Sequence, residues 1–208
     1  MANLKVNTVS GIGTEGTVFD GGLKFRSKNY MTLPKGNTTD AFPDFKAVPA
    51  ASARGIFAGG ISEPSPTRHN EIDYITIATT GNATDFGDLS LSRKFIASSG
   101  DSTRGLFMGG ETPTQKSVID YVTISSGGGA NDFGDLTEAK DFGVACNSSV
   151  RGIYGGGQTA DYKSDIEFVI IQSTGQANKF GDLTQARLGL GAGSSPTRAV
   201  FGLSLIHI

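Results

Sequence analysis

Arginines recur at equivalent places along the chain, and arginines that gather at one site can bind an acidic sugar. A guanidinium group forms two parallel hydrogen bonds with a carboxylate, so it also pairs readily with Asp or Glu of the same protein. Regular recurrence favours this second role, with the aspartates of the Gly-Asp-Leu triplets or the acidic residues Asp73, Asp120 and Glu167 as partners. The arginines are Arg54, Arg104, Arg151 and Arg198.

Two Asp-Phe-Gly tripeptides, at Asp85 and Asp132, match the metal-binding tripeptide of protein kinases. The His-Arg-Asp loop and the strand lysine that accompany it in kinases are missing. The aspartates that follow, Asp88, Asp135 and Asp182, give one carboxylate per copy, whereas calcium needs clustered oxygen donors. We therefore expect these aspartates to cap turns, and we predict no metal and no cofactor.

Two enzyme classes that use β-propellers were compared with the chain. Sialidases combine several arginines with a Ser-x-Asp-x-Gly-x-Thr-Trp box, which the chain does not contain. Copper-radical oxidases need Cys, Tyr and His ligands, but Cys146 is the one cysteine and His69 the one histidine before residue 203. The sequence predicts no catalytic residues, with a glycan hydrolase completed by further blades as a remote alternative.

An internal repeat organises these residues. Asp85-Phe86-Gly87-Asp88-Leu89 returns near residues 132 and 179, at steps of 47. The segment Arg54 to Gly60 returns at residues 104, 151 and 198, at steps of 50, 47 and 47. The extra residues of the first copy lie between Gly60 and Ile72, which predicts a loop of variable length there.

Composition indicates that each repeat is made of strands. The 208 residues include 30 glycines, and each glycine inside a helix costs about 1 kcal/mol relative to alanine. In the second repeat we predict strands near residues 95–99, 105–108, 118–124 and 132–136. The third of these is largely apolar on both faces, as a strand packed between two sheets must be. The sequence therefore predicts an all-β fold made of propeller blades.

The order of motifs resembles the kelch family of β-propellers, in which an apolar strand ends in Gly-Gly and aromatic residues follow in the next two strands. The second repeat supplies Gly109-Gly110, Tyr121 and Phe133, although Phe replaces the tryptophan usual in the last strand. The resemblance implies three blades and a fragment over residues 44–202. The expected limits are about 44–91, 92–138, 139–185 and 186–202.

The amino-acid sequence of the repeats, together with the opening segment from Asn3 to Gly16, also resembles that of structural proteins of marine tailed bacteriophages. This resemblance implies a non-enzymatic tail or fibre component of the virion. Its partners would be other virion proteins and a host surface glycan or protein. The alternative is a cytoplasmic kelch-type interaction module.

Both ends of the chain fall outside the repeats. Residues 1–43 predict a small β unit with a hairpin over residues 18–25, which either attaches the protein to the particle or caps the propeller. Residues 203–208, Leu-Ser-Leu-Ile-His-Ile, match the translation of a transposon-end adapter used for sequencing libraries. We expect these six residues to be an artefact and the natural repeat to continue beyond Gly202.

Charge and hydropathy restrict the partners. The net charge is −2 without a basic run, which argues against nucleic-acid binding, and no apolar stretch is long enough for membrane insertion. Cys146 is expected to be a small buried core residue. Loops that differ among repeats can carry specificity, so we predict the contact surface at Arg68, His69 and Asn70. Residues 112–116 and 159–163 are the counterparts of this segment.

Overall fold

The computed structural model describes residues 53–64 and 66–204, and these form antiparallel β-sheets without a helix. The prediction of an all-β protein is confirmed. The predicted N-terminal unit over residues 1–43 and its hairpin lie outside the described residues, as do residues 205–208. Within the described part, no helix is long and apolar enough to cross a membrane.

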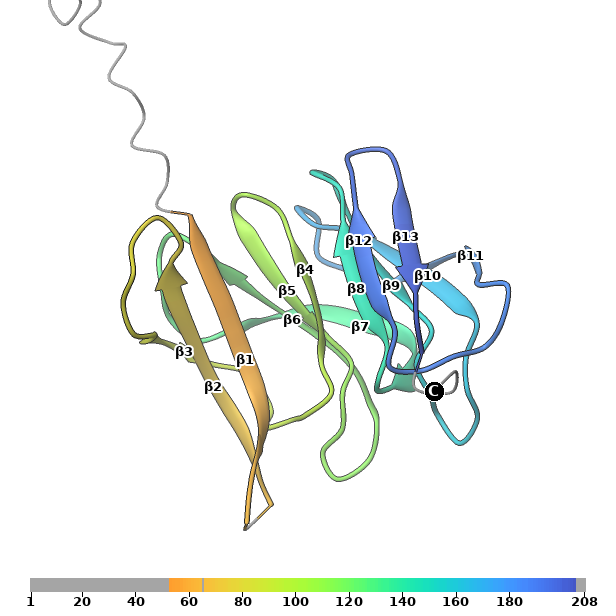
Figure 1. Cartoon of the computed structure of the whole chain (residues 1–208), viewed down its shortest axis with the longest axis horizontal. Helices are drawn as coiled ribbons and strands as arrows, with labels where there is room; N and C mark the ends of the chain where they lie inside the picture. The colour runs from red at the N-terminus through yellow and green to blue at the C-terminus, as the bar shows by residue number, and fades with distance from the viewer. Residues whose placement is uncertain (1–52, 65, 205–208) are drawn as a thin grey trace, which may run out of the picture. The chain divides into compact units, whose positions relative to one another are not determined.

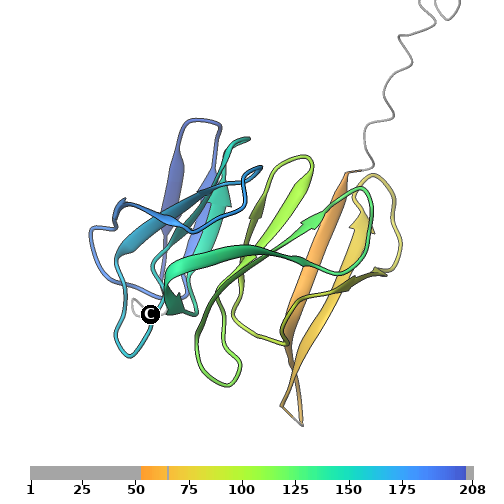
Figure 2. The same cartoon turned by 180° about the vertical axis from the view of Figure 1, so that it is seen from behind.

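The strands group in chain order (Figures 1 and 2). Sheet I contains β1 (Arg54–Ser62), β2 (Thr67–Thr76) and β3 (Thr84–Asp88). Sheet II contains β4 (Ala97–Gly100), β5 (Arg104–Met108), β6 (Lys116–Thr123) and β7 (Asn131–Lys140). Sheet III contains β8 (Val144–Asn147), β9 (Arg151–Gly155), β10 (Asp165–Ile170) and β11 (Asn178–Asp182). A two-stranded sheet of β12 (Gly191–Ser194) and β13 (Ala199–Gly202) follows.

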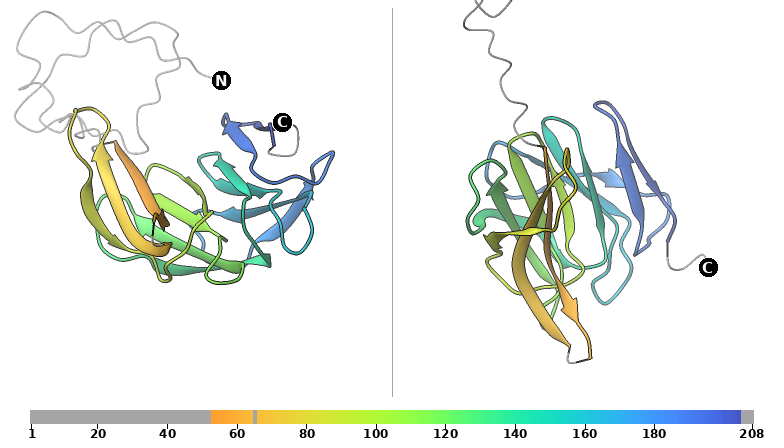
Figure 3. Two further views of the ribbon diagram at one scale, coloured as in Figure 1. Left: turned by 60° about the horizontal axis from the view of Figure 1, so that its bottom comes forward. Right: turned by 60° about the vertical axis from the view of Figure 1, so that its left-hand side comes forward.

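Sheet II, sheet III and the β12–β13 sheet contact one another through their first strands. Strand β4 contacts β8, and β8 contacts β12. Figure 3 shows the sheets following one another from β1 to β13. Strands far apart in the sequence therefore meet at one repeated kind of interface, as the constant 47-residue step predicts.

The segment that holds the three extra residues of the first repeat is mostly a hairpin. Strands β1 and β2 extend into it, where Ile61 pairs with Arg68 and Ser62 pairs with Thr67. A register shift lies between Ala58 and Gly60. The predicted Pro-rich loop is therefore limited to the turn around Glu63, Pro64 and Pro66, because the residues on either side pair across the hairpin and satisfy their own backbone hydrogen bonds.

The paired glycines have the backbone role expected of them. Gly109 and Gly110 have φ values of 65° and 98°, a region that other residues rarely adopt. The Gly110 amide donates to the carbonyl of Lys140, at 2.9 Å, in the segment that leads into sheet III. The same bond joins Gly60 to Arg93 and Gly157 to Arg187, both at 2.9 Å. Each glycine pair thus turns the chain and bonds its sheet to the point where the chain leaves that sheet.

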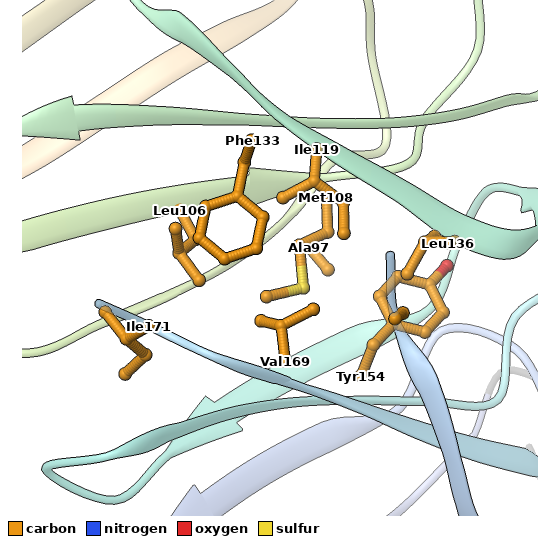
Figure 4. Close-up of a cluster of buried hydrophobic side chains, with 10 residues drawn as sticks. Ala97, Leu106, Met108, Ile119, Phe133, Leu136, Tyr154, Val169 and Ile171 are labelled. Carbon is orange, nitrogen blue, oxygen red and sulfur yellow. The ribbon is translucent and has the colours of Figure 1, made fainter. Parts of the chain in front are cut away.

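The main hydrophobic core lies between sheets II and III (Figure 4). Leu106, Met108 and Ile119 of sheet II pack with Tyr154 and Val169 of sheet III. A second cluster, which includes Ile72 and Val122, lies between sheets I and II. Sheet II is therefore apolar on both faces, as predicted. Cys146 is also buried, and burial raises the pKa of its thiol.

Candidate functional site

The repeated arginines stack on aromatic rings of their own sheets. The guanidinium carbons of Arg54, Arg104 and Arg151 lie 4.5, 4.5 and 4.7 Å from the ring centroids of Tyr74, Tyr121 and Phe168. Arg54 also donates to the carbonyl of Ile124 at 2.6 Å, and Arg104 donates to that of Ile171 at 3.1 Å. Both acceptors belong to the following sheet. Within the described residues these three arginines meet no carboxylate, so the predicted pairing with Asp or Glu is wrong.

The acidic residues predicted as partners, Asp120 and Glu167, form ion pairs with other cations. Arg93 donates to Asp120 at 2.6 Å, and both side chains are fully buried. The buried Lys140 pairs with the buried Glu167 and with the partly exposed Asp165. Residues Arg93, Lys140 and Arg187 follow one another at steps of 47, and each of the first two pairs with an acidic residue 27 positions later. The sequence analysis missed this series, although its spacing was visible.

The aspartates of the strand motif have local partners. Asp85 and Asp132 each accept from the amide two residues later, that of Gly87 or Gly134, at 3.1 Å. Asp135 accepts from the Ser117 hydroxyl at 2.8 Å, and Asp182 pairs with Lys179 at 3.0 Å. For Asp135 and Asp182 the expected capping of the following turn is therefore replaced by side-chain pairs. No group of three His, Cys, Asp or Glu side chains in the described part could hold a metal ion.

The predicted contact residues lie in β2, where they are half-buried. Arg68 pairs with Glu111 of sheet II at 2.9 Å. His69 Nδ1 lies 3.1 Å from Glu71, and the Asn70 amide donates to the same carboxylate at 3.1 Å. The structure thus brings Arg68 to the junction of two sheets. The carbonyls of His69 and Asn70 accept from the amides of Arg93 and Leu89, in the segment that leaves sheet I.

An aromatic stack adjoins this junction. The rings of Phe95 and Phe142 lie 3.7 Å apart at 24°, and Phe95 is 37% exposed. The Lys94 ammonium lies 4.5 Å from the centre of the Phe95 ring and 3.5 Å from Glu111. We call Arg68, Lys94, Phe95, Glu111 and Phe142 the Phe95 surface.

Backbone strain marks the Phe95 surface. Phe95 and Phe142 have φ values of 57° and 52°, which a bulky residue adopts only when its surroundings enforce them. Gly189, one repeat later, has a φ of 60°. The sequence analysis did not identify Phe95, but the recurrence of Phe, Phe and Gly at steps of 47 was a signal for this conformation.

Asp141 lies beside Phe142 and is 1% exposed. Neither of its carboxylate oxygens makes a well-aligned hydrogen bond among the described residues, although the side chains of Gln158 and Gln115 lie close enough to act on it. Burial raises the pKa of Asp141 and the charge of Glu111 raises it further, while Gln158 and Gln115 lower it in part. A cation or a proton is the natural counterpart of such a carboxylate.

The Phe95 surface combines a partly exposed aromatic stack with two cations and a carboxylate, which suits ligand binding more than bond cleavage. No protein-family model matches the chain, and no curated protein matches it. Geometry therefore carries the functional argument.

Proposed function

We propose that the chain is a non-enzymatic binding scaffold, built as kelch-like β-propeller blades, that serves as a structural or adhesion component of a virion. In this proposal sheets I, II and III are blades and the β12–β13 hairpin begins a fourth. The partners are other virion proteins and a host surface glycan or protein.

The repeated interface supports the propeller. The Gly128 amide donates to the carbonyl of Phe86, and the Gly175 amide donates to that of Phe133, each at 2.7 Å. The connection between the last two strands of one sheet therefore meets the last strand of the sheet before it. The paired glycines and stacked arginines repeat with the same step. A contact that is the same at every junction turns each sheet by a similar amount, which is how propeller blades are arranged.

The strained and exposed Phe95 is the observation that carries the binding role. The exposed part of the Phe95 and Phe142 stack offers apolar contact to the C–H groups of a sugar ring. Arg68, Lys94 and Glu111 lie beside it and can hydrogen-bond to hydroxyl groups. Arg54, Arg104 and Arg151, in contrast, each stack on a ring of their own sheet and are not gathered around one substrate.

The test of binding is a glycan array followed by titration of the best ligand. We expect Phe95→Ala to weaken binding by roughly ten-fold or more, because one aromatic contact is lost. Phe57→Ala is the matched control, since Phe57 is exposed on sheet I and outside the Phe95 surface. Equal effects of the two substitutions would place the ligand elsewhere. Capsid, portal and tail genes beside the coding sequence would support the virion role, and their absence would favour a cellular interaction module.

A further inference from the structure

Two short ladders of backbone bridges, one repeat apart, carry polar groups of the Phe95 surface and its surroundings. The amides of Glu111 and Gln158 donate to the carbonyls of Lys94 and Asp141, both at 2.9 Å. The backbone is therefore arranged in the same way in both ladders, and the difference between them lies in the side chains. The ladders join, in order, Lys94, Glu111 and Gln115 in the first and Asp141, Gln158 and Tyr162 in the second.

In the first ladder, one carboxylate holds both cations of the Phe95 surface. Glu111 Oε1 lies 2.9 Å from Arg68 Nη2, and Glu111 Oε2 lies 3.5 Å from Lys94 Nζ. The side chains of Lys94 and Glu111 are only 19% and 20% exposed, and Lys94 also lies over the Phe95 ring. Each carboxylate oxygen thus has its own cation. An acidic ligand would have to compete with Glu111 for Arg68 and Lys94.

The second ladder adds a carboxylate and no cation. Asp141 is buried, and the charge of Glu111 acts on it, as do the side chains of Gln115 and Gln158. Tyr162, at the end of this ladder, is an exposed aromatic residue. With Asp141 ionised, two carboxylates balance Arg68 and Lys94, so these residues leave no excess positive charge for a ligand.

We propose that the Phe95 surface selects uncharged sugars over acidic ones, and that Glu111 is the residue that determines this specificity. The Phe95 and Phe142 stack contacts the C–H groups of the sugar, and the amides of Gln115 and Gln158 supply donors and acceptors for its hydroxyl groups. A carboxylate or sulfate group on the sugar would meet the like charge of Glu111, which costs affinity. The inference rests on the proposed binding of a glycan at this surface and adds the charge class of that glycan.

The test is a glycan array in which each neutral oligosaccharide is printed beside its acidic form, for example lactose beside 3′-sialyllactose. We expect the unaltered chain to bind the neutral member of a pair about ten-fold more tightly, because the acidic member meets Glu111. Glu111→Gln keeps the shape of the side chain but releases both cations, so the preference should reverse toward the acidic member. Glu138→Gln is the matched control, since Glu138 holds Lys163 at 2.9 Å in an ion pair outside the Phe95 surface.

The outcomes separate this inference from the proposed function. A preference of the unaltered chain for acidic members that Phe95→Ala abolishes would overturn the specificity but keep glycan binding at the Phe95 surface. Equal effects of Glu111→Gln and Glu138→Gln would overturn the role of Glu111. Absence of binding to every glycan would overturn the proposed function and this inference with it. If circular dichroism shows that Glu111→Gln does not fold, the comparison of neutral and acidic members on the unaltered chain still decides the question.

Discussion

At the residue scale, the most consequential groups are the buried charges. Arg93 is fully buried, and besides Asp120 it donates to the carbonyls of Gly109 and Val118 at 2.6 and 2.9 Å. The arginine therefore joins three positions of sheet II around one charge. Removal of one member of such a pair leaves the other charge buried and uncompensated.

We expect Asp120→Ala to lower the free energy of unfolding by about 3–5 kcal/mol, because Arg93 loses its counter-charge. Chemical denaturation followed by circular dichroism measures the change. The exposed Asp161→Ala serves as control and should change stability by less than about 0.5 kcal/mol. Similar losses in the two variants would show that the buried pair does not stabilise the fold.

Asp141 should make the stability of the fold depend on pH in the opposite direction to a carboxylate that is paired with a cation. Burial raises its pKa above the ordinary value of 3.8, so the folded state holds this proton to a higher pH than the unfolded state does. The contribution of Asp141 to stability therefore falls as the pH rises from 3.8 through the folded pKa.

Asp141→Asn removes this ionisation. We expect the variant to be more stable than the unaltered protein at pH 7, and the difference to shrink as the pH falls toward 4, where Asp141 itself becomes neutral. Thermal unfolding at a series of pH values measures the difference, with Asp161→Asn as control. A difference that stays constant with pH would rule out a raised pKa at Asp141.

At the element scale, the last strands of sheets I, II and III contain a glycine at the same position of the repeat, namely Gly87, Gly134 and Gly181. Gly134 in β7 has a φ of 140°, and a Cβ placed there would lie 2.3 Å from the carbonyl oxygen of Gly175. Gly181 occupies the same position of β11, and a Cβ there would meet nothing within 4 Å. The same substitution can therefore be compared at Gly134, where the next sheet lies close, and at Gly181, where no atom lies close.

We expect Gly134→Ala to destabilise the protein by at least about 1–3 kcal/mol, from the strained backbone alone, with the clash added. Gly181→Ala should be close to neutral, because Gly181 lacks the positive φ of Gly134 and no atom lies within 4 Å of the added Cβ. Denaturation curves of the two variants provide the measurement. Equal stability of both would contradict the close packing of sheets II and III at this point.

At the scale of the whole molecule, apolar side chains remain exposed at both ends of the series of sheets. Phe57 in β1 is 59% exposed, Phe180 in β11 is 54% exposed, and Val200 in β13 is 68% exposed. Such patches usually mark a surface that another molecule covers.

We expect the isolated chain to self-associate reversibly, with Val200→Lys weakening association by roughly ten-fold, since burial of a valine contributes about 1.5–3 kcal/mol. Sedimentation equilibrium over a range of concentrations measures this effect. Ser173→Lys, an exposed change of the same charge, is the control. A chain that stays monomeric at all concentrations would contradict the prediction.

The repeat spacing was sufficient to predict the strands of the second repeat, the paired glycines and the two apolar faces of sheet II. These features depend on local backbone preference and on the alternation of side chains along a strand. Both are determined by residues that are adjacent in the sequence. Cys146 was predicted as a core residue for the same reason. The identity of the ligand and the attachment to a virion stay predictions.

Only the tertiary structure decided which groups meet. Arg104 and Arg93 carry the same charge, and spacing alone does not tell which of them reaches Asp120. The answer depends on the twist of the strands and on the approach of the next sheet, which put Arg104 over Tyr121 and Arg93 inside sheet II. The stack of Phe95 and Phe142 arises in the same way, because contacts across 47 residues hold two backbones in a conformation that neither segment prefers by itself.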